Sequence, residues 1–272
     1  MELEFWGVRG TAPVSSRDKM KYGGHTPCAV VTGAAGETVI IDAGTGIKDL
    51  GEKMMESAGA DETRYHVFLT HFHLDHVIGL PFFAPLYSPQ AVFTFYSHLS
   101  PQEAEKCLRA VMGGMSFPVD FRETASRKSF VKVEKDSYSI GKLKISACPL
   151  LHPQGSLAYR IEEGKVSIVF ATDTEPPEQG MDERLASFIK GVTCVIYDAT
   201  FTPEEYLRRQ GWGHSTWLEG AKLARQSGVR KLVLSHFNPD HNDRQIDEMV
   251  KQARKEFRRT YAARERMRLK VV

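Results

Sequence analysis

The sequence predicts an α/β protein of the four-layer αββα type, in which two β-sheets pack face to face and helices cover the outer faces. Three observations support this prediction. Short apolar runs recur from end to end, separated by turn residues. Many of these runs follow one another as hairpins. Helical segments are interspersed and are added at the end of each half, which favours stacked sheets over a doubly wound parallel sheet.

The first half of the chain contains strands and two helices. Gly-Ala-Ala-Gly at 33–36 separates two apolar runs and predicts a hairpin. A helical spacing of apolar residues follows "DAGTG" and stops at Gly59. Ser100 as N-cap and Pro101 at the first helical position predict the second helix. The predicted strands cover 3–8, 28–33, 37–42, 66–70 and 91–96, and the predicted helices cover 47–58 and 100–112.

The second half begins with two further predicted hairpins, one formed by 129–134 and 143–150, the other by 157–163 and 166–173. After these hairpins the pattern changes to helices that alternate with strands. The predicted helices cover 183–190, 216–226 and a segment that begins near Asp243, and the predicted strands cover 194–200, 231–236 and 267–272.

The chain shows no internal repeat and no linker, so we expect a single domain over residues 1–272. The irregular stretch 97–128, rich in Gly, Pro and Met, is the best candidate for an inserted flap. Phe117 and Pro118 in this flap, with Met112 and Met115, either cover a base or pack the flap onto the body.

Composition indicates a globular, cytoplasmic protein. At 272 residues and 42% hydrophobic, the chain can bury a substantial core, and its formal net charge of +2 neither requires nor excludes nucleic acid. The four cysteines are far apart without a CxxC pair, which suits a reducing compartment. No secretion signal or membrane-length apolar run is present.

The stretch "HFHLDH" at 71–76 predicts a metal site. His71 and His73 follow a strand two positions apart, so both can point into one cleft, and Asp75 and His76 follow in the turn. Four such ligands exceed what one tetrahedral ion with an open position takes from six residues. Two adjacent ions are the simpler solution, and they require further ligands from other strand ends.

Three further candidates follow β-like runs. His152 follows "KISACPLL", Asp173 follows "SIVFAT", and His236 follows "KLVLS". Each residue alone is as well explained by a strand-end hydrogen bond or a cap. Together with "HFHLDH" they predict a dinuclear centre, in which a carboxylate at Asp173 could bridge the two ions.

This set of residues resembles the metallo-β-lactamase superfamily over nearly the whole chain, and "IDAGTG" at 41–46 resembles an early strand and glycine turn of that superfamily. The superfamily fold is the αββα sandwich. The motifs are specific for the fold but only weakly specific for the substrate. The resemblance implies ligands for each ion: His71, His73 and His152 for the first, Asp75, His76 and His236 for the second, and Asp173 between them.

The stretch "GWGHSTW" at 211–217 indicates the reaction. It resembles the "GHST" motif of the phosphodiesterase branch, which includes RNase Z and cyclic-phosphodiester hydrolases. The resemblance implies that His214 reaches the scissile phosphate, where a cationic imidazole would stabilise charge or protonate the leaving oxygen. The simpler interpretation is that Ser215 or Thr216 caps a helix and His214 is an exposed loop residue. Asp75 and His214 are the predicted catalytic residues.

A small phosphodiester, of the cyclic nucleotide type, is the expected substrate. RNase Z-like enzymes usually carry a long tRNA-binding arm between the ligands that correspond to His152 and Asp173, and only a hairpin lies between them here. His25 stands where the related bacterial sequences suggest asparagine in "GGNT", and it is expected to form a hydrogen bond near the site, with a metal ligand as the alternative. Arg9 is a candidate for contact with a phosphate.

Other functions remain open at this stage. They are an RNase Z-like tRNA 3′-processing endonuclease, a thioester or lactone hydrolase or β-lactamase on the same fold, and a silent binding protein. The expected cofactors are two divalent ions, with zinc first and manganese or iron as alternatives. The expected partner is a small phosphodiester; RNA is not favoured, no membrane is expected, and a homodimer is left open.

Overall fold

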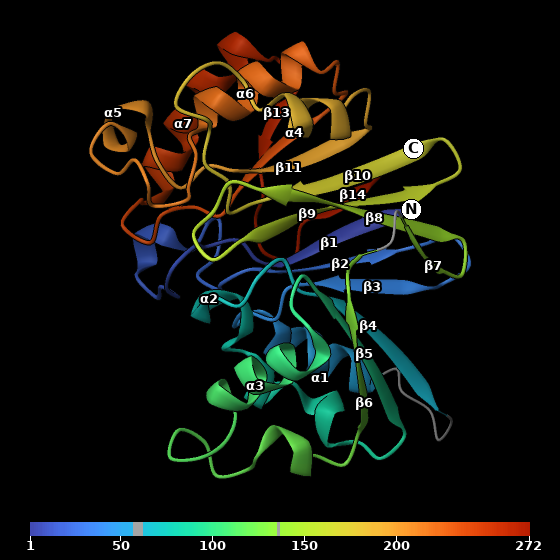
Figure 1. Ribbon diagram of the computed structural model, residues 1–272. Coiled ribbons are helices and arrows are strands. Elements are labelled where there is room, and N and C mark those ends of the chain that lie inside the picture. Colours follow the sequence, from blue (N-terminus) through green and yellow to red (C-terminus); the bar gives the residue numbers. More distant parts are fainter. Residues whose placement is uncertain (57–61, 135–136) are drawn as a thin grey trace.

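The computed structural model describes residues 1–56, 62–134 and 137–272, and two seven-stranded mixed sheets form the centre of this part of the chain (Figure 1). The strands of the first sheet are β1 (Glu2–Gly7), β2 (Cys28–Thr32), β3 (Thr38–Ile41), β4 (Thr63–Phe68), β5 (Ala91–Ser97), β6 (Arg127–Lys132) and β14 (Arg268–Lys270). They lie in the order β14-β1-β2-β3-β4-β5-β6. β14, β1, β2 and β3 are antiparallel neighbours, whereas β3 to β6 run parallel.

The second sheet repeats this design. Its strands are β7 (Tyr138–Ile140), β8 (Leu143–Leu150), β9 (Ser156–Glu163), β10 (Val166–Ala171), β11 (Cys194–Asp198), β12 (Leu232–Ser235) and β13 (Thr260–Ala262). They lie in the order β13-β12-β11-β10-β9-β8-β7. Again an antiparallel part, β7 to β10, is followed by a parallel part, β10 to β13. The carboxyl ends of the parallel strands provide edges where loop residues can meet.

Helices cover the outer faces of both sheets, so the observed architecture confirms the predicted four-layer αββα sandwich (Figure 1). On the side of the first sheet lie α1 (Ile47–Glu56), α2 (Leu74–Val77) and α3 (Pro101–Val111). The second sheet is flanked by α4 (Glu183–Phe188), α5 (Pro203–Tyr206), α6 (Trp217–Gln226) and α7 (Asp243–Glu256). Short 3₁₀ turns are η1 (Arg17–Lys19), η2 (Leu80–Phe82), η3 (Ala84–Tyr87) and η4 (Phe121–Glu123).

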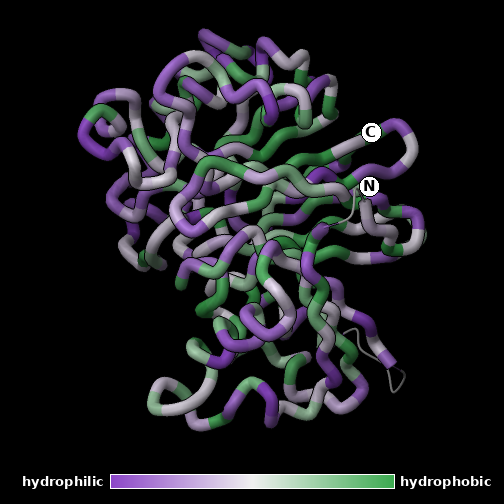
Figure 2. Tube along the Cα trace, viewed as in Figure 1, coloured by the Kyte–Doolittle hydropathy of each residue, from purple (hydrophilic) through white to green (hydrophobic). Residues whose placement is uncertain are grey.

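Successive side chains of a strand point to opposite faces of its sheet, and this alternation divides the apolar core into layers. Val31 and Val39 lie in the cluster that joins the two sheets, whereas their neighbours Val30 and Ile40 pack with Leu50 of α1. Successive strand residues point to opposite faces, so both faces of this sheet are buried. Figure 2 shows the hydrophobic residues concentrated along the strands and the hydrophilic residues in the outer loops.

Most predicted elements are confirmed, and one hairpin prediction is wrong. Residues 129–134 do not pair with 143–150, because β6 runs parallel to β5 in the first sheet. β8 pairs instead with β7, across a two-residue turn that connects Ile140 to Leu143. Gly141 has φ +56° in this turn, a conformation that favours glycine. β7 has only three residues and therefore gives little apolar periodicity to detect.

The helix predicted over 47–58 begins at Ile47 as expected and is described to Glu56, so its last two predicted residues lie outside the described part of the chain. The helix predicted over 100–112 has the expected start: Ser100 accepts a hydrogen bond from Glu103 N, and Pro101 occupies the first turn. None of the described helices is long and apolar enough to cross a bilayer.

The stretch 97–128 contains α3 and η4. Met112 and Phe121 are fully buried in the core beneath the first sheet, whereas Met115 is fully exposed. The stretch is therefore packed on the body at these two residues. Its origin as an insertion into a single domain over 1–272 stays a prediction.

Arg9 is a structural residue, and the expectation that it contacts a phosphate is wrong. Its side chain is completely buried. Nε donates to Gly23 O at 2.8 Å, Nη1 to His241 O at 2.7 Å and Nη2 to Lys19 O at 3.0 Å. The guanidinium thus joins the loop after β1 to the loop before α7, and no donor faces the solvent.

Replacing Arg9 with methionine should destabilise the protein by about 3 kcal/mol, because several buried carbonyl groups lose their donors. Urea unfolding followed by circular dichroism measures this change. Arg17→Met, at an exposed position of η1, is the control and should shift stability by less than about 0.5 kcal/mol. Equal stabilities of the two variants would contradict the structural role of Arg9.

Candidate active site

The candidate site lies where strands of both sheets end. Asp42 follows β3, Asp173 follows β10 and His236 follows β12, and all three have φ between +58° and +60°. This left-handed conformation is uncommon for residues other than glycine and is often stored at functional sites. It turns each chain sharply at the end of its strand, so that the side chains from both sheets converge.

All seven predicted ligands meet at this place. Nitrogen and oxygen atoms within 4.8 Å of one another define four overlapping groups: His71, His73 and His152; Asp75, His76 and His236; His71, His76 and Asp173; and Asp173, Asp198, His214 and His236. The first two groups coincide with the two ligand sets that the resemblance implied. The fourth adds Asp198 and His214, which lie outside those sets.

In the first group, His152 Nε2 lies 3.0 Å from His73 Nδ1. His71 is almost completely buried, whereas His73 and His152 are partly accessible. The rings of His71 and His152 meet edge to face, with centroids 4.7 Å apart. The three imidazoles therefore surround one point at the edge of the cleft.

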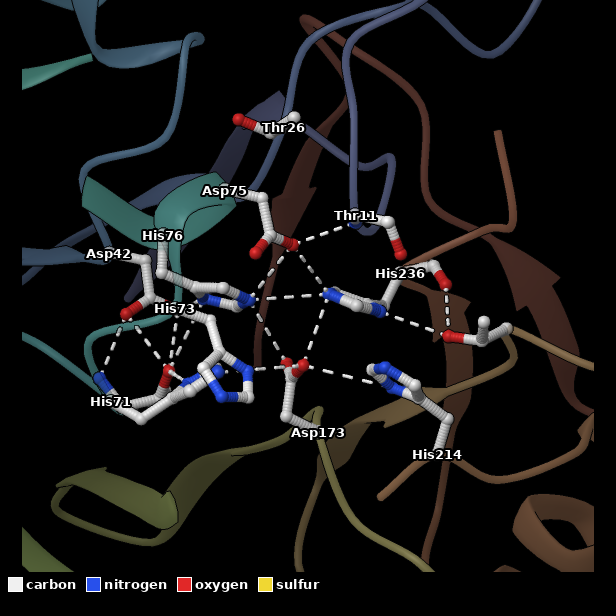
Figure 3. A network of polar contacts seen from close by, with 12 residues as sticks. Thr11, Thr26, Asp42, His71, His73, Asp75, His76, Asp173, His214 and His236 are labelled. Atoms are coloured by element: carbon white, nitrogen blue, oxygen red, sulfur yellow. Dashed lines mark hydrogen bonds and ion pairs between the residues drawn. The ribbon is translucent and has the colours of Figure 1, made fainter. Parts of the chain in front are cut away.

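In the second group, the Nε2 atoms of His76 and His236 are 3.2 Å apart. Asp75 Oδ2 lies 3.4 Å from His76 Nε2 and 3.3 Å from His236 Nε2 (Figure 3). Asp173 lies between the two groups: Oδ2 is 3.3 Å from His76 Nε2, and Oδ1 is 3.9 Å from His71 Nε2. A bridging position of the Asp173 carboxylate is compatible with this geometry.

Hydrogen bonds on the outer side of each ring fix which nitrogen faces the site. His76 Nδ1 lies 2.8 Å from Asp42 Oδ2, and His152 Nδ1 lies 2.7 Å from Gly213 O. These oxygens only accept, so Nδ1 carries the hydrogen and Nε2 presents its lone pair to the centre.

The other three imidazoles are oriented in the same manner. His236 Nδ1 is 3.0 Å from Thr200 Oγ1, whose own hydrogen is donated to His236 O. Thr70 Oγ1 likewise lies between His71 Nδ1, at 3.1 Å, and the Asp42 carboxylate. For His73, Nε2 is held by Gln154 Oε1 at 2.8 Å, which leaves Nδ1 for the site.

The donor set fits a pair of divalent ions. His71 Nε2 and Asp173 Oδ2 are buried without a hydrogen-bond partner among the described residues, which is costly unless something else binds there. Nitrogens held about 2.0–2.1 Å from one tetrahedral ion lie about 3.3 Å apart, close to the His76–His236 separation of 3.2 Å. Imidazole and carboxylate ligands suit zinc, manganese and iron alike.

His214 lies beside this centre and is held by a residue that the sequence did not reveal. His214 Nδ1 is 3.1 Å from Asp198 Oδ2 and 3.8 Å from Asp173 Oδ1, and its ring stacks on His236 with centroids 5.1 Å apart. Burial lowers the pKa of His214, but the carboxylate of Asp198 more than compensates and raises this pKa to about 9. A pKa in this range favours the protonated ring at neutral pH.

Asp198 is fully buried at the end of β11, and its carboxylate accepts several hydrogen bonds. Besides His214, its carboxylate accepts from the backbone N–H groups of Asp173, Thr200 and Ser215. The available sequence signal was an aspartate at the end of the buried run "CVIYD". Thr216 caps α6 as expected, with its side chain accepting from Glu219 N, so capping and a role for His214 coexist.

Glu175 fixes the loop that carries His214. Its Oε1 accepts from Gly211 N at 2.6 Å, and its Oε2 accepts from Gly213 N at 3.0 Å. Gly213 has φ +81°, and a Cβ there would lie 2.3 Å from His152 Nδ1. The loop therefore reaches the first histidine group only because position 213 has no side chain.

The loop after β1 closes the other side of the site. Thr11 N donates to Asp75 Oδ2 at 2.7 Å, and a Cβ on Gly10 would lie 2.3 Å from the His236 ring. His25 lies behind this loop, with Nδ1 3.1 Å from Thr45 Oγ1, and it belongs to none of the donor groups found among the described residues. This agrees with its expected hydrogen-bonding role rather than with an additional ligand.

Comparison with known proteins identifies the family. A family profile described as "Beta-lactamase superfamily domain" matches residues 37–237, which is more than half of the chain. The chain belongs to the β-lactamase superfamily. The matched region contains every predicted ligand and His214.

Curated relatives include two bacterial proteins named Ribonuclease Z. The protein of Oceanobacillus iheyensis is 26% identical over 245 residues, covering 72% of this chain and 78% of the relative. The protein of Porphyromonas gingivalis is 25% identical over 295 residues, covering 90% of this chain and 93% of the relative.

Solved structures share the fold. The metallo-β-lactamase fold protein YhfI of Bacillus subtilis aligns with TM-score 0.72 and 19% identity over 98% of both chains. A diphosphatase of the PhnP family aligns with TM-score 0.68 and 18% identity, covering 99% of this chain and 97% of its own. At these identities the likeness establishes the fold alone. Family and relatives together confirm the predicted superfamily and the predicted enzyme class, a metal-dependent hydrolase.

Asp42→Ala tests the arrangement of the centre without removing any ligand. Since Asp42 holds His76 and, through Thr70, also His71, its loss should weaken metal affinity about 10–100-fold. Asp75→Ala, which removes a donor, should lower metal content further and abolish activity. Competition with a chelator measures the affinity, and the exposed Asp18→Ala is the control. Unchanged affinity in Asp42→Ala would contradict the proposed arrangement.

Proposed function

We propose that this chain is a dinuclear metal-dependent phosphodiesterase that acts on a small phosphodiester of the cyclic nucleotide type. The observation that carries the proposal is His214, a positively charged imidazole held by Asp198 beside two groups of metal donors. A cation at this position matches the charge of a phosphodiester in its transition state better than it matches a neutral carbonyl substrate.

The donor groups support the ligand roles that the family resemblance implies. In this proposal His71, His73 and His152 would hold one ion, and Asp75, His76 and His236 would hold the second, with Asp173 shared between them. When bound, the two ions would supply a hydroxide at neutral pH and stabilise charge on the phosphoryl oxygens. Zinc is the expected metal, with manganese or iron as alternatives.

His214 is proposed as the general acid. Its Nδ1–H is donated to Asp198, which leaves Nε2–H for the leaving oxygen of the substrate. Its side chain keeps 14% of its surface exposed, whereas Asp198 is fully buried. The acid can therefore touch substrate while its orienting carboxylate remains protected from water.

A tRNA 3′-processing endonuclease is the second candidate, because the curated relatives are named Ribonuclease Z. Against it, β9 and β10 occupy the whole segment between His152 and Asp173, where a tRNA-binding arm would be expected. The small substrate therefore remains the first proposal, and RNA remains an alternative partner.

His214→Ala should slow phosphodiester hydrolysis by roughly 10²-fold or more while metal content stays near normal, since a general acid is lost and no ligand is removed. Single-turnover rates together with metal analysis of the same samples measure both effects. His66→Ala is a matched control, because His66 lies in β4, where its Nδ1 is 3.2 Å from Tyr96 Oη, and it belongs to none of the donor groups among the described residues. Full activity of His214→Ala would refute the acid role.

A substrate panel separates the two candidates. The metal-loaded protein should hydrolyse cyclic mononucleotides and should leave 3′-extended precursor tRNA uncut. Products are followed by chromatography for the nucleotides and by gel electrophoresis for the tRNA. Cleavage of the tRNA alone would replace the first proposal with the second.

A further inference from the structure

A pocket of about 610 Å³ opens beside the first histidine group. His152 belongs both to that group and to the pocket wall. Gly211, also in the wall, lies three positions before His214, and Gly213 between them is the hydrogen-bond partner of His152. The volume lies within the range of about 300–1,000 Å³ typical of small-molecule sites. A substrate whose phosphate lies at the donor groups would extend one of its ester groups into this pocket.

The wall of the pocket combines apolar and polar surface in similar amounts. Leu151, Pro176 and Pro177 supply aliphatic surface, and the ring of Tyr206 supplies an aromatic face. The Tyr206 hydroxyl is already donated to Glu175 Oε1 at 3.0 Å, so this ring is held in place. Fixed apolar and aromatic surfaces suit a flat organic ring.

Besides His152, Tyr206 and the neutral amide of Gln210, the pocket carries two acidic side chains, Glu175 and Glu178. Glu175 is occupied by its bonds to Tyr206 and to the loop N–H groups, but Glu178 is exposed and forms no hydrogen bond or ion pair with the described residues. Among the described residues that line the pocket, none is lysine or arginine. An accessible carboxylate without a cation repels phosphate groups and attracts hydrogen-bond donors.

We propose that this pocket binds the organic group esterified to the scissile phosphate, and that this group is an uncharged nitrogen heterocycle with hydrogen-bond donors, as in a nucleobase. Glu178 accepts a hydrogen bond from the ring and excludes the additional phosphates of a polynucleotide. The inference rests on the proposed phosphodiesterase function and specifies the organic group of its substrate. It assigns substrate selection to Glu178, which touches none of the metal donors.

Arg208 and Arg209 lie between the pocket residues Tyr206 and Gln210 but are not part of the pocket wall. Arg209 is turned toward the Phe201 ring. A separate group of cationic side chains lies elsewhere on the molecule. Arg230, Lys231, Arg259 and Lys270 line a different pocket, next to the beginnings of β11 and β12. The donor groups lie at the opposite, carboxyl ends of these strands. A polynucleotide attracted by these cations would therefore not be guided into the Glu178 pocket.

The test uses bis(p-nitrophenyl) phosphate as the reporter diester, with adenosine and a five-nucleotide single-stranded RNA as inhibitors. In the wild-type protein, adenosine should compete with the reporter, and the RNA should bind more weakly. Glu178→Lys should weaken inhibition by adenosine and strengthen inhibition by RNA, each by about tenfold, because one charge is reversed near the bound group. Glu178→Gln, which only removes the charge, should shift both constants in the same directions by less.

Glu56→Lys is the matched charge-reversal control, at an exposed position at the end of α1, and should leave both inhibition constants unchanged. Calorimetric titration of the metal-free protein with adenosine gives a readout independent of turnover, and Glu178→Lys should weaken this binding as well.

The possible failures are distinct. If the metal-loaded wild-type protein does not hydrolyse the reporter, the proposed function fails. If it does, but adenosine is not competitive, or Glu178→Lys behaves like Glu56→Lys, the pocket assignment is overturned. RNA that inhibits the wild-type protein more strongly than adenosine would equally overturn it, in favour of a polynucleotide.

Discussion

The carboxylate of Asp173 is the group on which the rest of the site depends. It is almost completely inaccessible to water, and burial alone would raise its pKa, but the imidazoles of His236 and His76 hold this pKa well below its usual range. A buried carboxylate is stable only where several partners compensate for its lost hydration. The imidazoles that face it come from both sheets, His76 from the first and His236 from the second, and where their lone pairs are turned inward the proposed divalent ions would supply the compensating charge. The packing of the two sheets and the assembly of the site therefore depend on each other.

Both sheets use the same strand arrangement to bring the side chains of the site together. In each sheet an antiparallel part is followed by parallel strands, and the chain leaves β3, β10 and β12 through residues with positive φ, namely Asp42, Asp173 and His236. Strain of this kind persists only where the surroundings hold it. Asp42 is held by Thr70, and Asp173 by Asp198 through its backbone N–H. Of the residues that bear the strain, Asp173 and His236 are thus proposed ligands, and Asp42 orients the ligand His76.

The sequence was sufficient to predict ligands that lie in a short motif or at the end of an apolar run. It was not sufficient for residues whose role depends on contacts with distant parts of the chain. "HFHLDH" could be interpreted because its ligands are neighbours, and His152, Asp173 and His236 because each follows an apolar run. Asp198 and Glu175 are isolated acids whose meaning depends on the loop at 211–214, which is distant in sequence. The prediction for β6 named the wrong partner for a related reason: its neighbour β5 lies 35 positions away in the pair Thr94 and Ser129, while the nearer β8 offered a more obvious hairpin.

The histidines divide into two kinds because of what their outer nitrogens touch. Those of the two donor groups give a hydrogen to a carbonyl, hydroxyl, amide or carboxylate oxygen and turn a lone pair inward. His214 also gives a hydrogen to a carboxylate, that of Asp198, yet it lies at the edge of the cleft and within 3.8 Å of the second carboxylate, Asp173. Both carboxylates face Nδ1 of His214 and leave its Nε2 for a substrate, whereas at His76 the carboxylates of Asp75 and Asp173 face Nε2, on the side of the proposed ions. The same side chain thus becomes a metal donor in one setting and a proton donor in the next, and the arrangement of buried aspartates decides between them.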